Sequence, residues 1–469
     1  MLLVPRVRSA GCGRNRRWRA LALAGCLFAV GRALSAKPAP PPTGAPRGAA
    51  PPAATPAPRT LALAESVQVA LQHSRAIQIA EERLQRARAQ VEEAKAPNRV
   101  QASLNANATR IDKVSTFFVP LPDGTAQEIS LGELYSRNLQ MSITKPIDIS
   151  GALRATRNIA ELGADSARLD ADRTRDQTVL DVKNAYYGVL RAQAALGVAQ
   201  ATVASLAEHL RQVRLFFEQG VVAQFDVLRA EAQVANAQQG EIAARNGVAL
   251  AKAALNNAMG IDVTTPLEVR AAEKVEIIHP AYRESVTTAY EQRPEVLQAA
   301  VTTELARRGV KLAHSSSLPT LGLGFNATHA LDPAGLAPRK TQWSASAVVS
   351  YPLLDGGLAR SRTRQAEADV DTARVAEEQT REGVALEVQQ AILSLGEAAE
   401  RMDAAEKNVA QAAEALRLAK LRYREGLSTA LDVTDAQAVL TQAESNSVNA
   451  RYDYLLGRAR YERATGQGQ

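Results

Sequence analysis

Cysteine, long apolar runs and histidine clusters are missing from most of this 469-residue chain. Its only two cysteines, Cys12 and Cys26, lie near the N-terminus, so disulfides contribute nothing to the folded body that follows. No apolar run after residue 36 approaches the roughly 18 residues of a transmembrane helix. The five histidines show no metal-ligand spacing, which indicates isolated surface or interface residues: His73, His209, His279, His314 and His329.

Signals for catalysis are also missing. The sequence has no nucleophile paired with a base, no phosphate-binding loop and no metal cluster. We therefore predict a protein that is not an enzyme, holds no metal and needs no cofactor.

The N-terminal segment accounts for the basic character of the chain. The formal net charge is +7, but residues 1–36 hold seven arginines and no acidic residue, so the remainder is neutral (7 − 7 = 0). Nucleic acid binding is therefore excluded. Arginines at the start of this segment precede an apolar stretch from Ala20 to Gly31 and a small-residue site at Leu34-Ser35-Ala36. This order is typical of a secretory signal peptide at residues 1–36, and we expect an exported protein without a membrane helix.

Two long copies of one unit make up the rest of the chain. Residues 65–109 are echoed at an offset of 219 positions, and residues 146–230 at an offset of 206. Only the loop between these segments differs, and it is 13 residues longer in the first copy. Such self-similarity indicates a structural duplication. The predicted domains are a Pro- and Ala-rich linker at 37–59, a first structural repeat at 60–279 and a second structural repeat at 280–465.

Each copy begins with a helix and continues with two strands. The first helix is predicted from about Leu61 to Ala96 and from Glu284 to about Ser315, and a proline ends each one. Apolar and polar residues then alternate with a period of two, and the polar members are nearly all Asn, Gln, Ser or Thr. The predicted strands lie at about 101–110, 137–146, 319–328 and 342–351.

The two faces of these strands favour a membrane sheet. Trp343 and Tyr351 lie eight residues apart on the apolar face, or roughly 26 Å, close to the height of a lipid-facing band between aromatic girdles. The uncharged polar face suits a water-filled lumen. The half-buried sheet of a soluble protein is the alternative, because it shows the same alternation. Four strands cannot close a barrel in lipid, so in a membrane several chains must share one.

Two very long helices follow the strands. A helical pattern spans residues 151–217 and again 357–423, about 67 residues or roughly 100 Å each, which signals a coiled coil. Apolar residues late in each pattern step by 3, 4, 3 and 4. Glycine-containing helical tips at 218–225 and 424–431 then turn the chain into a returning helix.

With these elements the chain resembles the TolC-like outer membrane efflux protein family over residues 61–465. The motif Pro352–Gly357 with Arg360, its weaker twin Pro146–Gly151 with Arg154, and the two tips carry the resemblance. It implies a mainly α fold with a membrane β part, in which three chains share a 12-stranded β-barrel and continue as a periplasmic α-barrel of coiled-coil helices. It also implies a passive exit duct in the outer membrane, which serves a tripartite efflux pump or a type I secretion system. A periplasmic adaptor and an inner-membrane pump are the implied partners.

The resemblance also assigns roles at the tips. Family members close their periplasmic aperture with acidic rings and a tyrosine-containing network, and the matching positions here are Tyr423, Asp432 and Asp435. The family's network also uses an arginine two residues after the tip glycine, where this chain has Ser428. This departure leaves the closed-state lock without its usual salt bridge. As the only helix-to-helix turns remote from the strands, the tips are the predicted adaptor-docking surface, with Gly220, Val221, Gly426 and Leu427.

The tip acids have a second interpretation. Asp226 and Asp432 each lie just after a turn, where a carboxylate caps a helix by accepting hydrogen bonds from free N–H groups. Asp435 differs, because its counterpart in the first copy is Arg229. Helix capping does not require opposite charges at matching positions of the two copies. For Asp435 we therefore favour a role at the aperture over a role in the helix.

Two further alternatives concern the anchor and the function. Leu23-Ala24-Gly25-Cys26 resembles a bacterial lipobox, and some members of the family are lipid-anchored, so Cys26 is a candidate lipidation site beside the favoured cleavage near Ala36. The alternative function is a soluble periplasmic coiled-coil scaffold or adaptor, which would need one helical hairpin rather than two copies. Drugs, metal cations and polypeptides are the candidate cargoes of a channel.

Overall fold

The computed structural model describes residues 59–130, 134–270, 275–332 and 340–468, all within one compact unit. The predicted signal peptide, Cys26 and nearly all of the predicted linker lie outside these residues. In the described part of the chain, no helix combines the length and the apolar character needed to cross a lipid bilayer.

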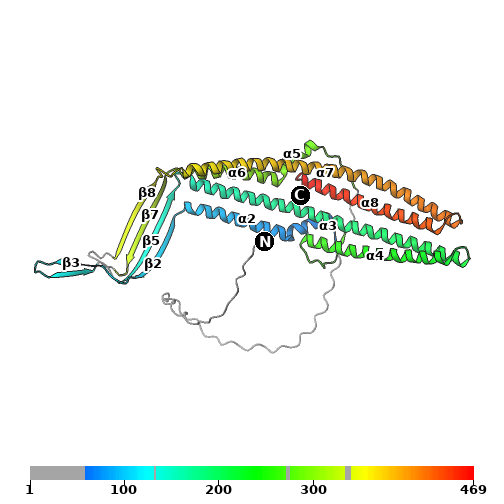
Figure 1. Ribbon diagram of the computed structural model, residues 1–469, viewed down its shortest axis with the longest axis horizontal. Helices are drawn as coiled ribbons and strands as arrows, with labels where there is room; N and C mark the ends of the chain where they lie inside the picture. Colours follow the sequence, from blue (N-terminus) through cyan, green and yellow to red (C-terminus); the bar gives the residue numbers. More distant parts are fainter. Residues whose placement is uncertain (1–58, 131–133, 271–274, 333–339, 469) are drawn as a thin grey trace, which may run out of the picture. The chain divides into compact units, whose positions relative to one another are not determined.

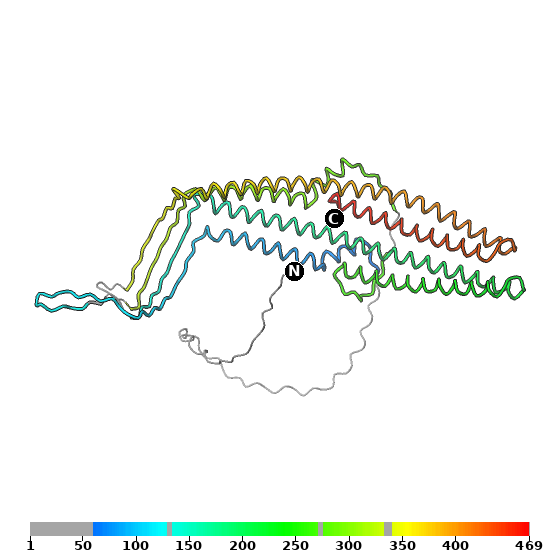
Figure 2. Tube along the Cα trace, viewed as in Figure 1, coloured from blue at the N-terminus to red at the C-terminus, as the bar shows by residue number. Residues whose placement is uncertain are grey.

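Two copies of one set of elements form this unit (Figure 1). The first copy contains α1 (Leu63–His73), α2 (Arg75–Lys95), β2 (Gln101–Arg110), β5 (Tyr135–Ile147), α3 (Ala152–Glu218) and α4 (Gln224–Met259). The second copy contains α5 (Tyr282–Gln292), α6 (Pro294–Ser315), β7 (Thr320–Ala330), β8 (Thr341–Ser350), α7 (Leu358–Arg424) and α8 (Ala430–Ala464). The four strands lie at one end of the long helices and the two tips at the other, as the tube in Figure 2 also shows. The predicted mainly α fold with four strands per chain is confirmed.

The four strands form one antiparallel sheet in the order β2-β5-β7-β8, so the central β5–β7 pair joins the two copies. The register of all three strand pairs mostly places polar residues beside polar residues and apolar residues beside apolar residues across the sheet. One polar row runs through Ser103, Ser142, Asn326 and Ser344, and the next, apolar row runs through Leu104, Met141, Ala327 and Trp343. The alternation within each strand therefore becomes one polar and one apolar face of the whole sheet.

An aspartate starts each long helix at the corner where the chain leaves the sheet. The carboxylate of Asp148 accepts hydrogen bonds from two backbone N–H groups at the start of α3 (3.2 and 2.9 Å). Asp355 accepts two in the same way at the start of α7 (2.9 and 2.8 Å). These bonds satisfy N–H groups that have no partner within the helix. Both helices then run for 67 residues, the length that the sequence pattern predicts.

The short N-terminal helix of each copy is broken once, which corrects the prediction of continuous helices. The breaks lie at Ser74, between α1 and α2, and at Arg293, between α5 and α6, where the backbone ψ is 125° and 124°. Arg293 precedes Pro294, and a residue before proline is disfavoured in helical conformation. Ser74 has no such neighbour, so tertiary packing must account for the first break.

A glycine from the end of a long helix packs against each break. Gly260 follows α4 with φ of 73°, and a Cβ there would lie 2.5 Å from the carbonyl oxygen of His73. Gly466 follows α8 with φ of 78°, and a Cβ there would lie 2.9 Å from the Cβ of Gln292. The two glycines lie 206 positions apart, which is the sequence offset between the long helices of the two copies. The two breaks lie 219 positions apart, which is the offset between the N-terminal helices. The same glycine-to-break contact therefore occurs in both copies.

Two small sheets were not predicted from the sequence. β1 (Arg59–Leu61) pairs in parallel with β6 (Leu267–Val269). β3 (Thr116–Pro120) and β4 (Ala126–Ser130) form an antiparallel hairpin within the β2–β5 loop. This hairpin accounts for the extra 13 residues of that loop in the first copy, and Figure 1 shows it beyond the end of the sheet that is remote from the helices.

We expect Gly260→Ala to lower the stability of the fold by at least about 2 kcal/mol. The substitution combines a left-handed backbone, which costs an L-residue roughly 1–2 kcal/mol, with a clash against the His73 backbone. Gly220→Ala is the matched control, because Gly220 has φ of 75° but nothing within 4 Å of its would-be Cβ. Thermal unfolding followed by circular dichroism in detergent measures both variants. Equal losses would show that the close contact with the break contributes nothing.

Candidate functional site

The two tips have the same backbone geometry. Gly220 and Gly426 adopt left-handed φ values of 75° and 69°. The residue after each glycine, Val221 or Leu427, donates its N–H to the carbonyl five residues earlier (2.8 Å in both), which closes the end of the helix. The side chains of Val221 and Leu427 are 66% and 70% exposed. The four predicted docking residues therefore form two small apolar protrusions at the remote end of the helices.

The predicted acids of the second tip have different environments. The Asp432 carboxylate accepts hydrogen bonds from the backbone N–H of Thr429 (2.8 Å) and from its hydroxyl (3.0 Å). These bonds, the backbone one first, lower the pKa of Asp432. Asp226 makes the corresponding bond to the N–H of Ala223 (3.3 Å). The capping role is therefore present in both copies. Asp435 is exposed, and no ion pair to it occurs among the described residues.

Tyr423 lies inside the tip rather than on its surface. It is only 3% exposed, and its hydroxyl has no hydrogen-bond partner. Its ring packs against His209 (ring centroids 5.1 Å apart) and Phe216 (5.4 Å), both on α3. Burial, and next the charge of Asp226, raises the pKa of Tyr423. The structure thus brings Asp432 and Asp435 to the surface of the tip and keeps Tyr423 in an apolar core that joins α3 to α7.

Ser428, where the resemblance implies an arginine in the family, has no charge with which to form an ion pair. Its hydroxyl is buried without a hydrogen-bond partner. Polar contacts further along the helices connect the two copies instead. Thr202 and Thr441 share a hydrogen bond of 2.9 Å, and Ser205 bonds to Gln437 and to Lys420. We call this set of contacts between α3 and the α7–α8 hairpin the polar seam.

The four-stranded sheet exposes both of its outer strands, β2 and β8. Every residue of β2 and of β8 is exposed. Trp343 and Tyr351, the predicted aromatic girdle residues, are 68% and 56% exposed, and Trp343 stacks on Phe325 (6.1 Å between ring centroids). Within the described residues neither outer edge has a neighbouring strand. The sheet is therefore incomplete in a single chain.

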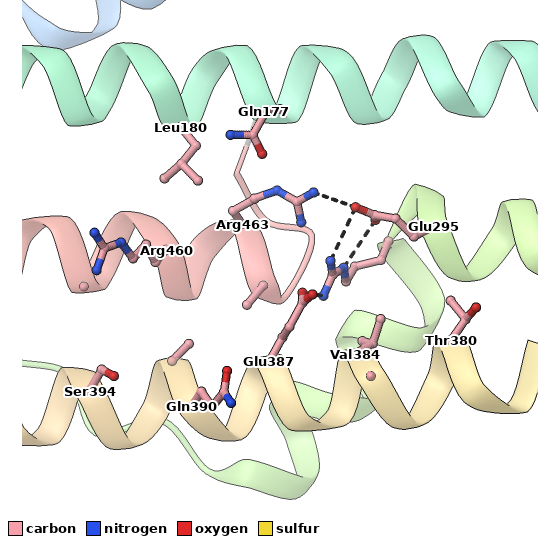
Figure 3. Close-up of a pocket in the computed structure, with 15 residues that line it drawn as sticks. Gln177, Leu180, Glu295, Thr380, Val384, Glu387, Gln390, Ser394, Arg460 and Arg463 are labelled. Carbon is pink, nitrogen blue, oxygen red and sulfur yellow. Dashed lines mark hydrogen bonds and ion pairs between the residues drawn. The ribbon is translucent and has the colours of Figure 1, made fainter. Parts of the chain in front are cut away.

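A cavity of about 650 Å³ lies between α3, α7 and the end of α8 (Figure 3). Beside it, Glu295 accepts hydrogen bonds from Arg293 (3.3 and 3.4 Å) and from Arg463 (2.5 Å). Arg293 is 3% exposed and also donates to Glu387 (2.6 Å). Burial by itself raises the pKa of Glu295, but the two guanidinium groups outweigh it and lower the pKa to about 2. This network ties the α5–α6 break to α7 and α8, and no sequence motif indicated it.

We expect Glu295→Gln to cost about 3 kcal/mol of stability at pH 7, because a pKa depressed from 4.5 to about 2 favours the folded state. That stabilisation is complete above the ordinary pKa of 4.5 and is lost as the pH falls toward 2. The stability difference between the parent protein and the variant should therefore shrink over this range. Thermal unfolding at a series of pH values measures it. Glu304→Gln, on the same helix in a more exposed pair with Arg308, should cost about 0.5 kcal/mol or less.

The part of the chain that the structure describes has no group of three or more His, Cys, Asp or Glu side chains arranged to hold a metal ion. The candidate functional elements of this part are two tips, a polar seam and a sheet with two open edges.

Known proteins similar to this chain in sequence and in fold belong to the outer membrane efflux proteins. The family model described as "Outer membrane efflux protein" matches residues 66–261 and 286–467. Outer membrane protein TolC of Vibrio cholerae is 29% identical over 306 residues, which span 62% of this chain and 68% of TolC. Protein CyaE of Bordetella pertussis is 27% identical over 464 residues, which span 94% of this chain and 92% of CyaE. The solved structure of the outer membrane protein VceC from Vibrio cholerae has the same fold, with a TM-score of 0.71 and 22% identity over 86% of this chain and 96% of VceC.

Proposed function

Because this chain belongs to the outer membrane efflux protein family, we propose that three copies of it form the passive outer membrane channel of an export system, either a tripartite efflux pump or a type I secretion system. The family consists of channel proteins rather than enzymes. The predictions of the family and of an outer membrane location agree with this membership. The partners that we infer are a periplasmic adaptor, which docks on the tips, and an inner-membrane pump.

The main support for a barrel shared between chains is that the outer edges of β2 and β8 have no neighbouring strand among the described residues. An edge in lipid leaves a row of N–H and C=O groups without partners, and each such group costs several kcal/mol. Pairing β8 of one chain with β2 of the next removes both edges. Three chains of four strands then close a barrel with its apolar face toward lipid and its Asn, Gln, Ser and Thr face toward the lumen.

Exposed apolar residues on the long helices support the same arrangement. Leu250 of α4 is 71% exposed, whereas its repeat counterpart Leu456 of α8 is half-buried. Leu386 of α7 is 57% exposed, whereas its counterpart Leu180 of α3 is half-buried. Within one chain α8 packs against α3. We infer that α4 of one chain packs against α7 of the next in the same way, which continues the helical wall around the trimer.

This repeat geometry predicts a specific crosslink between chains. Thr202 and Thr441 are in contact across the polar seam, and their counterparts at an offset of 206 are Asn408 and Ala235, which are both exposed. Asn408→Cys combined with Ala235→Cys should form a disulfide between neighbouring chains. Non-reducing electrophoresis after mild oxidation should then show covalent trimers.

Thr202→Cys combined with Thr441→Cys is the matched control for this experiment. Its disulfide should form within one chain and leave the monomer mass unchanged. The natural Cys12 and Cys26 are common to both variants and cannot explain a difference. Covalent dimers without trimers, or no crosslink at all, would contradict the closed ring.

The tip acids predict cation selectivity. Three copies of Asp435, exposed and without an ion pair among the described residues, would place a ring of charge at the narrow end of the channel. Such a ring favours cations and binds multivalent ones. We expect planar-bilayer currents to be cation-selective and to be blocked by a trivalent cation added on the tip side. Asp435→Asn should relieve most of the block without loss of stability.

Asp432→Asn separates the capping role from the charge. Because the Asp432 carboxylate is engaged with Thr429, this variant should relieve the block only in part and should destabilise α8 by about 1 kcal/mol. A block that persists in the double variant would show that these acids only cap and solvate the helix.

A further inference from the structure

His209 is a buried ionisable group in the apolar core of the tip. It lies on α3 and is 3% exposed, and neither ring nitrogen has a hydrogen-bond partner. The ring packs edge-on against Tyr423 of α7, with 62° between the ring planes, and the Tyr423 hydroxyl is also unpartnered. The backbone of Ala430 at the start of α8 is near the ring but outside hydrogen-bond geometry. The imidazole therefore lies where the first hairpin, α3–α4, meets the second, α7–α8.

Among the described residues, no carboxylate forms an ion pair with the His209 ring. On α7 the Lys420 ammonium acts on the ring; it is half-buried, bonded to Ser205, and influenced by the charges of Arg424 and Glu208. On α3, Glu208 pairs with Arg211.

Near the tip, three acids of the other two helices are also engaged, and Asp435 is exposed on the surface of α8 without an ion pair among the described residues. On α4, Glu231 pairs with Arg214 (2.7 Å), and Asp226 bonds to the backbone of Ala223. On α8, Asp432 caps the helix through Thr429. A proton on His209 would thus create a buried cation beside a second cation, an arrangement that proteins avoid unless an anion compensates.

We propose that His209 is a proton-binding site that controls the tip: its protonation separates the α3–α4 hairpin from the α7–α8 hairpin and so opens the channel at this end. The inference rests on the proposed channel function. Separation would expose the imidazole to water and would break the polar seam, whose hydroxyl, amide and ammonium groups can all be hydrated. The Tyr423 hydroxyl would gain hydrogen bonds with water in the same movement.

The sign of the pH dependence follows from burial. Desolvation in the packed tip lowers the pKa of His209, Lys420 lowers it further, and the backbone of Ala430 raises it in part. In a separated tip the exposed ring would return to its ordinary pKa of about 6.5. Above pH 6.5 the ring is neutral in both states and the packed tip has its full stability. Below pH 6.5, each further decrease of one pH unit shifts the equilibrium between packed and separated tips toward the separated state by up to about tenfold per chain. This shift ends at the pKa that His209 has in the packed tip.

The experiment is a comparison of planar-bilayer conductance at pH 7.5 and pH 5.5 on the tip side of the channel. The parent protein should show a several-fold higher open probability at pH 5.5. His209→Phe keeps an aromatic ring against Tyr423 but cannot be protonated, so its conductance should be the same at both pH values. His209→Gln, which is polar and neutral, provides a second variant in case the larger ring disturbs packing.

Two further variants identify where the proton acts. Thr202→Cys with Thr441→Cys locks the polar seam, so it should abolish the pH response when oxidised and restore it when reduced. Asp435→Asn should retain the pH response, because it leaves the buried imidazole of His209 and the polar seam unchanged. A response that persists in His209→Phe and His209→Gln would overturn the proposal. Absence of any channel in the parent protein would instead overturn the proposed function.

Discussion

An antiparallel sheet with two uncovered edges is the constraint on which the rest of this structure depends. Four strands present one apolar face, one uncharged polar face and two rows of unpaired backbone groups. Lipid tolerates such a sheet only as part of a closed barrel, because unpaired N–H and C=O groups cannot find water there. In the proposed trimer, further copies of the chain close the barrel. The capped corners at Asp148 and Asp355 direct α3 and α7 away from the sheet, so in that trimer the ring of strands would continue as a ring of helices.

The duplication gives both halves of the wall the same backbone and different side chains. The shared features are structural: the left-handed glycines that pack on the two helix breaks, and the 67-residue helices. The differences include features described above. Asp435, the proposed aperture acid, has Arg229 at the matching position of the first copy, and the described β3–β4 hairpin belongs to the first copy. The Arg293 network has Ser74 at the matching position of the first copy.

The sequence was sufficient for the features that depend on periodicity. Alternation predicted the four strands to within a few residues, and helical spacing predicted both long helices, because in each case one side of the element must be apolar throughout. The helix break at Ser74 could not be predicted, since no proline follows it and the residue that packs against it, Gly260, comes almost two hundred residues later. The short β1–β6 and β3–β4 pairs have too few residues to show a period.

At the tips the sequence identified the turns and the acids but not the core between them. The capping role of Asp432 followed from its position after a turn, which is a local property. The burial of Tyr423 and His209 depends on how two hairpins pack, and no local pattern encodes it. The place of His209 directly before Leu210 in the apolar pattern of α3 was the one available signal, and isolated histidines are usually surface or interface residues without a role.

The chemistry of the polar seam fits a contact that must open and close. An apolar seam would lose roughly 25 cal/mol for every Å² exposed on opening, so a long one would be effectively permanent. Hydrogen bonds such as Thr202 to Thr441 are exchanged for bonds with water on opening, at a net cost of only about 1 kcal/mol each. In the proposed opening, the polar seam would therefore separate at a lower cost than an apolar seam of the same length. A short apolar cluster around Tyr423 adds cohesion at the tip, and the buried imidazole of His209, whose ring nitrogens have no hydrogen-bond partner, packs against the Tyr423 ring.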